Sequence, residues 1–217
     1  MLRGYSACVE RAILVRHAES AASARGLLNG DPYRYVPLTN TGREQARQLG
    51  ERLRGESIDL CITSRFPRTR ETADIALEGR PVPRRVIREL DDVRVGDFEG
   101  RDVEDLRRWQ QVNPPTAEPP GGGESRVESV LRYCDAYRVL LTLDEPSLLV
   151  VAHGLPVTAV LLGMRGEDIP LTLEGVQVAP ADPHSVTPDD LGRAIRHLRE
   201  WASRVSAAAP GFSATGA

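Results

Sequence analysis

Two histidines follow short apolar runs of the sequence, where they could take part in the chemistry of an anion. Arg16 and His17 come directly after the first run, and His153 and Gly154 come directly after a later one. Apolar runs of this length indicate buried strands, and parallel α/β sheets bind ligands beyond the carboxyl ends of their strands. An arginine there can hold an anion and an imidazole can attack it. A structural role is the alternative for either histidine alone, but two equivalent positions favour a shared site.

A second arginine, Arg68, stands where a strand would pass into a helix. The first turn of a helix has unpaired N–H groups and a dipole that favour an anion, and Arg68 lies in that turn. Arg65 and Arg70 on either side are interpreted as solvated or ion-paired. A phosphoryl group, with about two negative charges near neutral pH, matches the arginine fork. We therefore expect a phosphate pocket without metal or cofactor, because arginines and a histidine supply the positive charge.

Cleavage of a phosphate ester also needs a group that protonates the leaving oxygen, and residues 89–100 offer several carboxyls. The spacing of these carboxyls alone does not choose between them; they belong to Glu89, Asp91, Asp92, Asp97 and Glu99. The alternative for this stretch is a solvated acidic turn that has no catalytic role.

The composition limits the classes of protein to which the chain can belong. The 217 residues suit one domain, and a net charge of −3 without long runs of one sign predicts no nucleic-acid or acidic-membrane partner. All 28 basic residues are arginine, which excludes a Walker A lysine and a Schiff-base lysine. Cys8, Cys61 and Cys134 are widely spaced, which predicts neither a disulfide framework nor a cysteine-rich zinc site.

The sequence gives no sign of a targeting or membrane segment. Residues 1–9 lack the basic region and apolar stretch of a signal peptide, and no apolar run approaches the length of a membrane span. We therefore expect a cytoplasmic protein.

Alternating strand and helix patterns predict the elements that must position these groups. Strands are predicted at residues 11–15, 58–63, 84–88, 147–152 and, as an edge strand, 176–179. Helices are predicted at residues 39–54, 67–77, 102–112, 124–143, 155–164 and 188–205. This order is typical of a three-layer α/β/α fold with a mostly parallel, doubly wound sheet. We expect one domain over residues 1–205, a small helical and loop insertion at about 101–124 over the active site, and a disordered tail at 206–217.

The motifs, in their order, resemble those of the histidine phosphatase superfamily, the phosphoglycerate-mutase-like branch 1. The family opens on R-H-G-E-[ST], which corresponds to residues 16–20. The next motifs are P-L-T-x-x-G-x-x-Q-A at 37–46, S-P-L-x-R-A-x-Q-T-A at 64–73 and L-x-E-x-x-x-G-x-[WF]-E-G at 90–100. The last two are P-x-G-E-S around 123–125 and H-G at 153–154. Each motif alone is weak, but six in family order over residues 11 to about 165 are specific.

Three residues depart from the family pattern. Ala18 replaces a glycine. Asp92 stands where the family has a glutamate and is one methylene shorter, so Glu89 and Asp91 stay as alternatives. Ser23 stands where many members have an asparagine that contacts the phosphate, so this contact is weaker here or is made by another group.

The resemblance implies a single histidine-phosphatase-like domain that hydrolyses a small-molecule phosphomonoester without a metal. It implies that His17 attacks phosphorus as a neutral imidazole, while its other ring nitrogen donates to a backbone carbonyl. Asp92 would protonate the leaving group and then activate the water that cleaves the phosphohistidine. The residues implied to hold the phosphoryl group are Arg16, Ser23, Arg68, His153 and Gly154.

Three other functions stay open. A phosphoglycerate-mutase-type phosphotransferase would use the same residues but return the phosphoryl group to another hydroxyl; the absence of longer insertions favours the phosphatase. A non-catalytic phosphoryl-binding module would lack the nucleophile or the acid. A metal hydrolase would use His17, His153 and Asp92, but the adjacent arginines repel a cation.

The motifs identify the substrate only as a small phosphorylated metabolite. Its leaving group would meet residues 18–39, the insertion and residues 176–187. The candidate contacts, each more often an ordinary surface or packing residue, are Arg25, Tyr33, Arg34, Tyr35 and Trp109. The sequence does not determine the oligomeric state, so a homodimer stays open.

Overall fold

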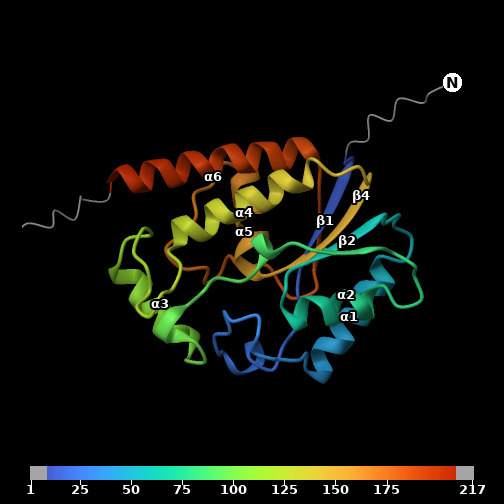
Figure 1. Cartoon of the computed structure of the whole chain (residues 1–217), viewed down its shortest axis with the longest axis horizontal. Coiled ribbons are helices and arrows are strands. Elements are labelled where there is room, and N and C mark those ends of the chain that lie inside the picture. Colours follow the sequence, from blue (N-terminus) through green and yellow to red (C-terminus); the bar gives the residue numbers. More distant parts are fainter. Residues whose placement is uncertain (1–8, 209–217) are drawn as a thin grey trace, which may run out of the picture.

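The computed structural model describes residues 9–208, in which a five-stranded sheet lies between two layers of helices (Figure 1). In spatial order the strands are β3 (Arg84–Val86), β2 (Leu60–Thr63), β4 (Ser147–Ala152), β1 (Arg11–Arg16) and β5 (Pro183–Val186). The first four are parallel, and β5 runs antiparallel to β1. The predicted three-layer α/β/α fold with a mostly parallel sheet is therefore confirmed.

The central strands are apolar along their whole length because both faces of the sheet are covered. All six residues of β4 are buried, and successive side chains of the strands point to opposite faces. Leu14 and Val150 belong to the core on one face, whereas Val15 and Val151 belong to the core on the other. This burial on both sides explains why the strands read as continuous apolar runs.

The helices form the two outer layers (Figure 1). One layer contributes its apolar residues to the smaller core and consists of α1 (Asn40–Arg52) and α2 (Pro67–Ala76). The other covers the opposite face and consists of α4 (Arg126–Leu140), α5 (Gly154–Met164) and α6 (Pro188–Ala208). A further helix, α3 (Val103–Val112), lies to one side of these layers. Short 3₁₀ turns are formed by Ser23–Arg25, Arg88–Leu90 and Gly96–Phe98.

The edge strand predicted at 176–179 is wrong, because the edge beside β1 is formed by β5. In the predicted segment the N–H of Val178 donates to Thr158 Oγ1 (3.2 Å), and its carbonyl accepts from Arg16 Nη1 (2.9 Å). Side chains therefore satisfy the backbone groups that a strand ladder would use. β5 begins at Pro183, which an edge strand tolerates because one side of its backbone needs no partner strand.

The C-terminal helix is longer than predicted. α6 continues to Ala208, so residues 206–208, expected to start a disordered tail, are helical. Two of these three residues are alanine, the strongest helix former. The rest of that tail, like Cys8 and most of the N-terminal segment, lies outside the described residues. Within residues 9–208, none of the helices is long and apolar enough to cross a membrane.

Candidate active site

The carboxyl ends of β1 and β4 bring two histidines together. Arg16 lies opposite Ala152 in the parallel register, so the next residues, His17 and His153, leave the sheet side by side. Their ring centroids are 5.3 Å apart, and both side chains are buried. The two imidazoles therefore lie side by side at a crevice beyond the ends of the strands; His17 lines this crevice, whereas His153 is fully buried beside it.

Arg68 lies at the centre of this crevice and contacts most of its polar groups. It stands in the first turn of α2, where its guanidinium carbon packs 4.2 Å from the ring centroid of Phe66. Its Nε donates to His17 Nε2 (3.0 Å), and its Nη1 donates to Asn29 Oδ1 (2.6 Å). Its Nη2 forms an ion pair with Asp92 (2.8 Å). Burial lowers the pKa of Arg68 and Asp92 opposes this shift, so the guanidinium stays charged.

The hydrogen bonds of His17 fix its tautomer. Its Nδ1 lies 2.7 Å from the carbonyl oxygen of Ala18, which can only accept, so Nδ1 carries the proton. Its Nε2 accepts from Arg68. Burial lowers the pKa of His17 well below its usual value, and the charges of Arg68, His153 and Arg16 act in the same direction. His17 is therefore a neutral imidazole near neutral pH, with the lone pair on Nε2.

His153 is fully buried directly before α5 and is held from two sides. Its Nε2 lies 2.9 Å from Ser64 Oγ, while its Nδ1 lies 3.2 Å from Arg68 Nη2 and 3.3 Å from Asp92 Oδ2. Burial lowers its pKa well below the usual histidine value, and nearby arginines reinforce this effect. Its ring orientation is thus set by contacts to groups from three other segments.

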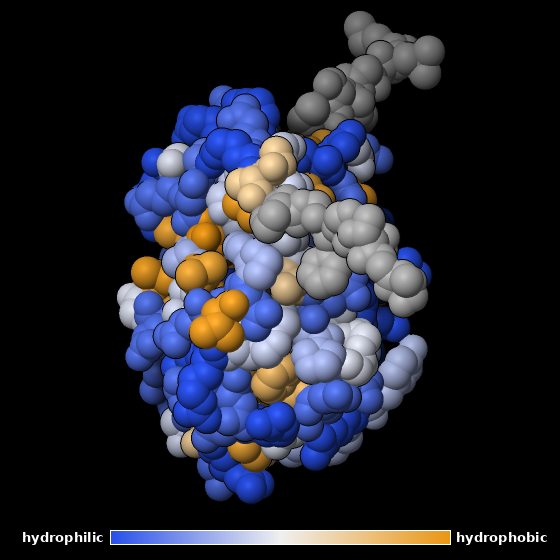
Figure 2. All heavy atoms as spheres, turned by 90° about the vertical axis from the view of Figure 1, so that its left-hand side faces the viewer, coloured by the Kyte–Doolittle hydropathy of each residue, from blue (hydrophilic) through white to orange (hydrophobic). Residues whose placement is uncertain are grey.

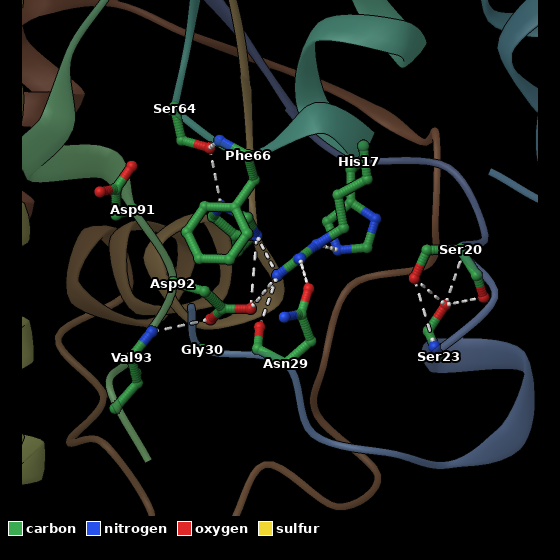
Figure 3. A network of polar contacts seen from close by, with 12 residues as sticks. His17, Ser20, Ser23, Asn29, Gly30, Ser64, Phe66, Asp91, Asp92 and Val93 are labelled. Carbon is green, nitrogen blue, oxygen red and sulfur yellow. Dashed lines mark hydrogen bonds and ion pairs between the residues drawn. The ribbon is translucent and has the colours of Figure 1, made fainter. Parts of the chain in front are cut away.

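Of the three carboxyls considered as proton donors, Asp92 is the one that lines the cavity at the crevice. The carboxylate of Asp91 accepts from N (2.8 Å) and Nε (2.6 Å) of Arg65 and points away from the network (Figure 3). Glu89 pairs with Arg88 at 3.0 Å outside this cavity. Neighbouring residues of an extended backbone point in opposite directions, which separates Asp92 from Asp91.

Arg16 and Gly154 also line the crevice. Arg16 donates from Nη1 to Val178 O, whereas its buried Nε has no hydrogen-bond partner within residues 9–208. Gly154 opens α5, and its backbone lies against the side chain of Gln177. A buried donor without a partner, beside the start of a helix, suits an anionic ligand.

Ser23 lines the cavity but uses its hydroxyl within its own turn. Its Oγ accepts from Ser20 N (2.9 Å) and donates to Ser20 O (3.1 Å), apart from the network around Arg68 (Figure 3). Asn29, which no motif singles out, instead holds Arg68 across 39 residues of sequence. In the sequence, Asn29 stands directly before Gly30, and this dipeptide indicates a turn rather than a contact with a distant residue.

A cavity of about 340 Å³ extends outward from the crevice. Its wall combines polar and apolar residues, some of them from α3 and the loop that follows; the apolar ones include Leu28, Val95, Leu106, Trp109, Pro114 and Leu171. Figure 2 shows the side of the molecule that carries α3, where apolar side chains interrupt a mostly hydrophilic surface. Of the proposed substrate contacts, Trp109 lines the cavity, whereas Arg25, Tyr33, Arg34 and Tyr35 do not.

The arrangement combines a neutral imidazole with two guanidiniums and a carboxyl in a largely buried crevice. Guanidiniums can hold the oxygens of a phosphoryl group, an imidazole can attack phosphorus, and a carboxyl can transfer a proton. Within residues 9–208, histidine, cysteine and acidic side chains form no group of three that could hold a metal ion.

Comparison with known proteins agrees with this chemistry. A sequence model of the histidine phosphatase superfamily (branch 1) matches residues 12–200. The adenosylcobalamin/alpha-ribazole phosphatase of Salmonella typhimurium is 34% identical over 152 residues, or 64% of this chain and 72% of that protein. A 2,3-bisphosphoglycerate-dependent phosphoglycerate mutase of Methylobacterium sp. is 33% identical over 175 residues, or 73% and 83%. The crystal structure of the alpha-ribazole phosphatase from Shigella flexneri superposes with a TM-score of 0.67 at 27% identity, covering 81% of this chain and 89% of that one.

The fold and the crevice together define an α/β phosphatase. The chain belongs to the histidine phosphatase superfamily, branch 1. It is a phosphoric monoester hydrolase. The family and the enzyme class predicted from the motifs are therefore confirmed.

Proposed function

We propose that the protein hydrolyses a small phosphomonoester through a phosphohistidine formed on His17, without a metal ion. The observation that carries the proposal is the state of His17: Nδ1 donates to Ala18 O, and burial among positive charges lowers the pKa of the ring. Nε2 is then an unprotonated nucleophile near neutral pH. The three widely spaced cysteines, which predict no disulfide framework, favour a reduced compartment such as the cytoplasm, and the arginines of the crevice favour a phosphorylated metabolite.

In the first step, Arg16 and Arg68 donate to the phosphoryl oxygens beside His153 and neutralise their charge. Once Arg68 Nε turns to the phosphoryl group, the lone pair of His17 Nε2 is free. Nε2 forms a bond to phosphorus while the bond from phosphorus to the leaving oxygen breaks. Asp92, in its protonated form, gives its proton to that oxygen.

In the second step, water attacks phosphorus from the side that the alcohol has left. The Asp92 carboxylate takes a proton from this water, and the bond between phosphorus and His17 Nε2 breaks. The electron pair returns to Nε2, and inorganic phosphate leaves. Asp92 is protonated again, so the proton given to the alcohol is replaced by one from water and the cycle closes.

A phosphotransferase of the phosphoglycerate mutase type is the second candidate, because one relative with 33% identity carries that name. Such an enzyme would pass the phosphoryl group from His17 to a second hydroxyl instead of water. Measuring phosphoryl exchange after priming with a bisphosphate separates the two enzymes. A mutase would transfer the phosphoryl group to the acceptor alcohol, whereas a phosphatase would release phosphate at the same rate with and without this alcohol.

The test is the replacement of His17 by asparagine, followed by phosphate release from p-nitrophenyl phosphate. The variant should lose more than about a thousandfold in kcat, since nucleophile removal is among the largest single losses in enzymes. Wild type should keep full activity in excess chelator. Rapid alkaline quenching during turnover of a substrate with a radiolabelled phosphoryl group should trap the label on His17 alone, because phosphohistidine is stable in alkali and labile in acid.

The matched control is His184→Asn, because His184 lies on β5 beside Asp182 (3.5 Å) and outside the cavity. This variant should match wild type in kcat. Full activity of His17→Asn, or phosphoryl label still trapped on this variant, would refute the proposal.

A further inference from the structure

Arg126 carries a charge in the cavity wall that no group of the described chain matches. It is the first residue of α4, and its side chain lines the cavity. Its Nη1 is buried without a hydrogen-bond partner within residues 9–208. Its Nη2 lies 3.4 Å from the carbonyl oxygen of Leu171, at the outer limit of a hydrogen bond. Within residues 9–208, the Nη1 donors of Arg126 are therefore unused.

A cation at this position is unfavourable in the free protein. Burial lowers the pKa of Arg126 to about 10, because it disfavours the charged form of the guanidinium. The start of a helix also repels positive charge, because the peptide dipoles of α4 place their positive end there. Residues that break local rules in this way are expected at functional sites, where a ligand supplies the missing partner.

The other cavity arginines show that Arg126 is a separate case. Arg68 pairs with Asp92, and Arg107 pairs with Glu104, so their charges are matched within the protein. Arg16, which in the described residues pairs with no carboxylate, belongs to the phosphoryl site. Within the described residues, Arg126 shares no hydrogen bond with the groups of that site, and its polar contact is to Leu171, which also lines the cavity. In the described part of the chain, the cavity therefore holds a second unmatched cation in addition to Arg16.

We propose that Arg126 binds a second anionic group on the leaving alcohol, so that the preferred substrates are phosphomonoesters that also carry a carboxylate or a second phosphoryl group. This inference rests on the proposed function, because the phosphoryl group at His17 defines where the leaving alcohol begins. The cavity, at about 340 Å³, falls in the size range of small-molecule sites and exceeds what one phosphoryl group fills.

The experiment compares three flexible esters that differ at one end: propyl phosphate, 3-phosphonooxypropanoate and propane-1,3-diol bisphosphate. Wild type should show a higher kcat/KM for an ester with a second anion. Arg126→Met should lose roughly 10- to 100-fold on that ester and less than about threefold on propyl phosphate, the range for one charge-assisted hydrogen bond. Arg126→Lys should restore part of the preference. The ester with the larger loss identifies the group as carboxylate or phosphoryl.

Two controls separate recognition from folding. Arg138→Met, on an exposed position of the same helix, should leave all three rates unchanged. Arg126→Met should melt at the same temperature as wild type or above it, because the variant removes a partly buried charge that pairs with no carboxylate of the described residues.

Equal losses of Arg126→Met on all three esters, a lower melting temperature, or a wild type without preference would each overturn the inference while leaving the phosphatase intact. A wild type that hydrolyses none of the esters would instead refute the proposed function, and this inference with it.

Discussion

The neutrality of the two buried histidines can be tested through the stability of the protein. His17 and His153 both have pKa values well below 6.5 in the folded state, mainly because burial disfavours the charged ring. In the unfolded chain both rings face water and titrate near the ordinary value. Below that value the unfolded state therefore takes up protons that the folded state does not. The free energy of unfolding is therefore unaffected by these two rings above the ordinary histidine pKa, and it decreases as the pH falls below that value.

The size of this effect follows from proton linkage. If His17 and His153 stay neutral in the folded state, each costs about 1 kcal/mol of unfolding free energy when the pH falls from about 7 to about 5.5. The two together cost about 2 to 3 kcal/mol. This is a large share of the roughly 5 to 15 kcal/mol that stabilises a typical domain.

The assay is urea unfolding followed by far-ultraviolet circular dichroism, at about pH 7 and about pH 5.5. Wild type and the double variant His17→Asn, His153→Asn are compared in a buffer free of phosphate, because an anion in the crevice would stabilise the folded state. The double variant should lose about 2 to 3 kcal/mol less than wild type over this interval. Equal losses in the two proteins would show that the rings protonate normally in the fold, and would refute the neutral-nucleophile argument.

Three further predictions concern the neighbours of the nucleophile. Asp92→Asn should reduce kcat by about 10²- to 10⁴-fold on an alkyl phosphate but far less on p-nitrophenyl phosphate, whose leaving group needs no proton; equal losses would exclude Asp92 as the acid. Asp91→Asn should lower the unfolding free energy by about 1 kcal/mol, with little change in kcat. This loss is small for an ion pair because Arg65 is 39% exposed, so solvent screens its attraction to Asp91. The reverse pattern would make Asp91 the acid. Ser23→Ala should raise KM less than about threefold, and a rise above about tenfold would indicate a direct phosphate contact.

The central strands could be predicted because their buried environment determines the amino-acid types in their own short segments. A parallel strand with both faces covered is apolar throughout, and β4 occupies the residues 147–152 that were predicted. The same logic placed His17 and His153 at the carboxyl ends of two strands, and the structure shows that these strands are neighbours. The start of α2 was also local, since Pro67 fits the first helical turn, where its missing N–H needs no partner.

The edge of the sheet could not be predicted in this way. β5 has the mixed sequence Pro-His-Ser-Val, and only Val186 in it is fully buried. An edge strand has an unpaired side and part of its surface in water, so neither continuous apolar character nor clear alternation marks it. The more apolar segment 176–179 was therefore chosen, although its backbone groups bond to Thr158 and Arg16.

The sequence by itself determined the reactive groups: a histidine and an arginine after one strand, a histidine after another, and an arginine at a helix start. Only the tertiary structure decided their partners. It placed Asp92 rather than Asp91 at the crevice, set Asn29 against Arg68, and left Arg126 without a matching charge. These outcomes depend on contacts between residues far apart in the chain, such as Arg68 and His153, 85 positions apart. Local propensity and motif spacing do not encode such distances, because they are set by the packing of the helices and loops against the sheet.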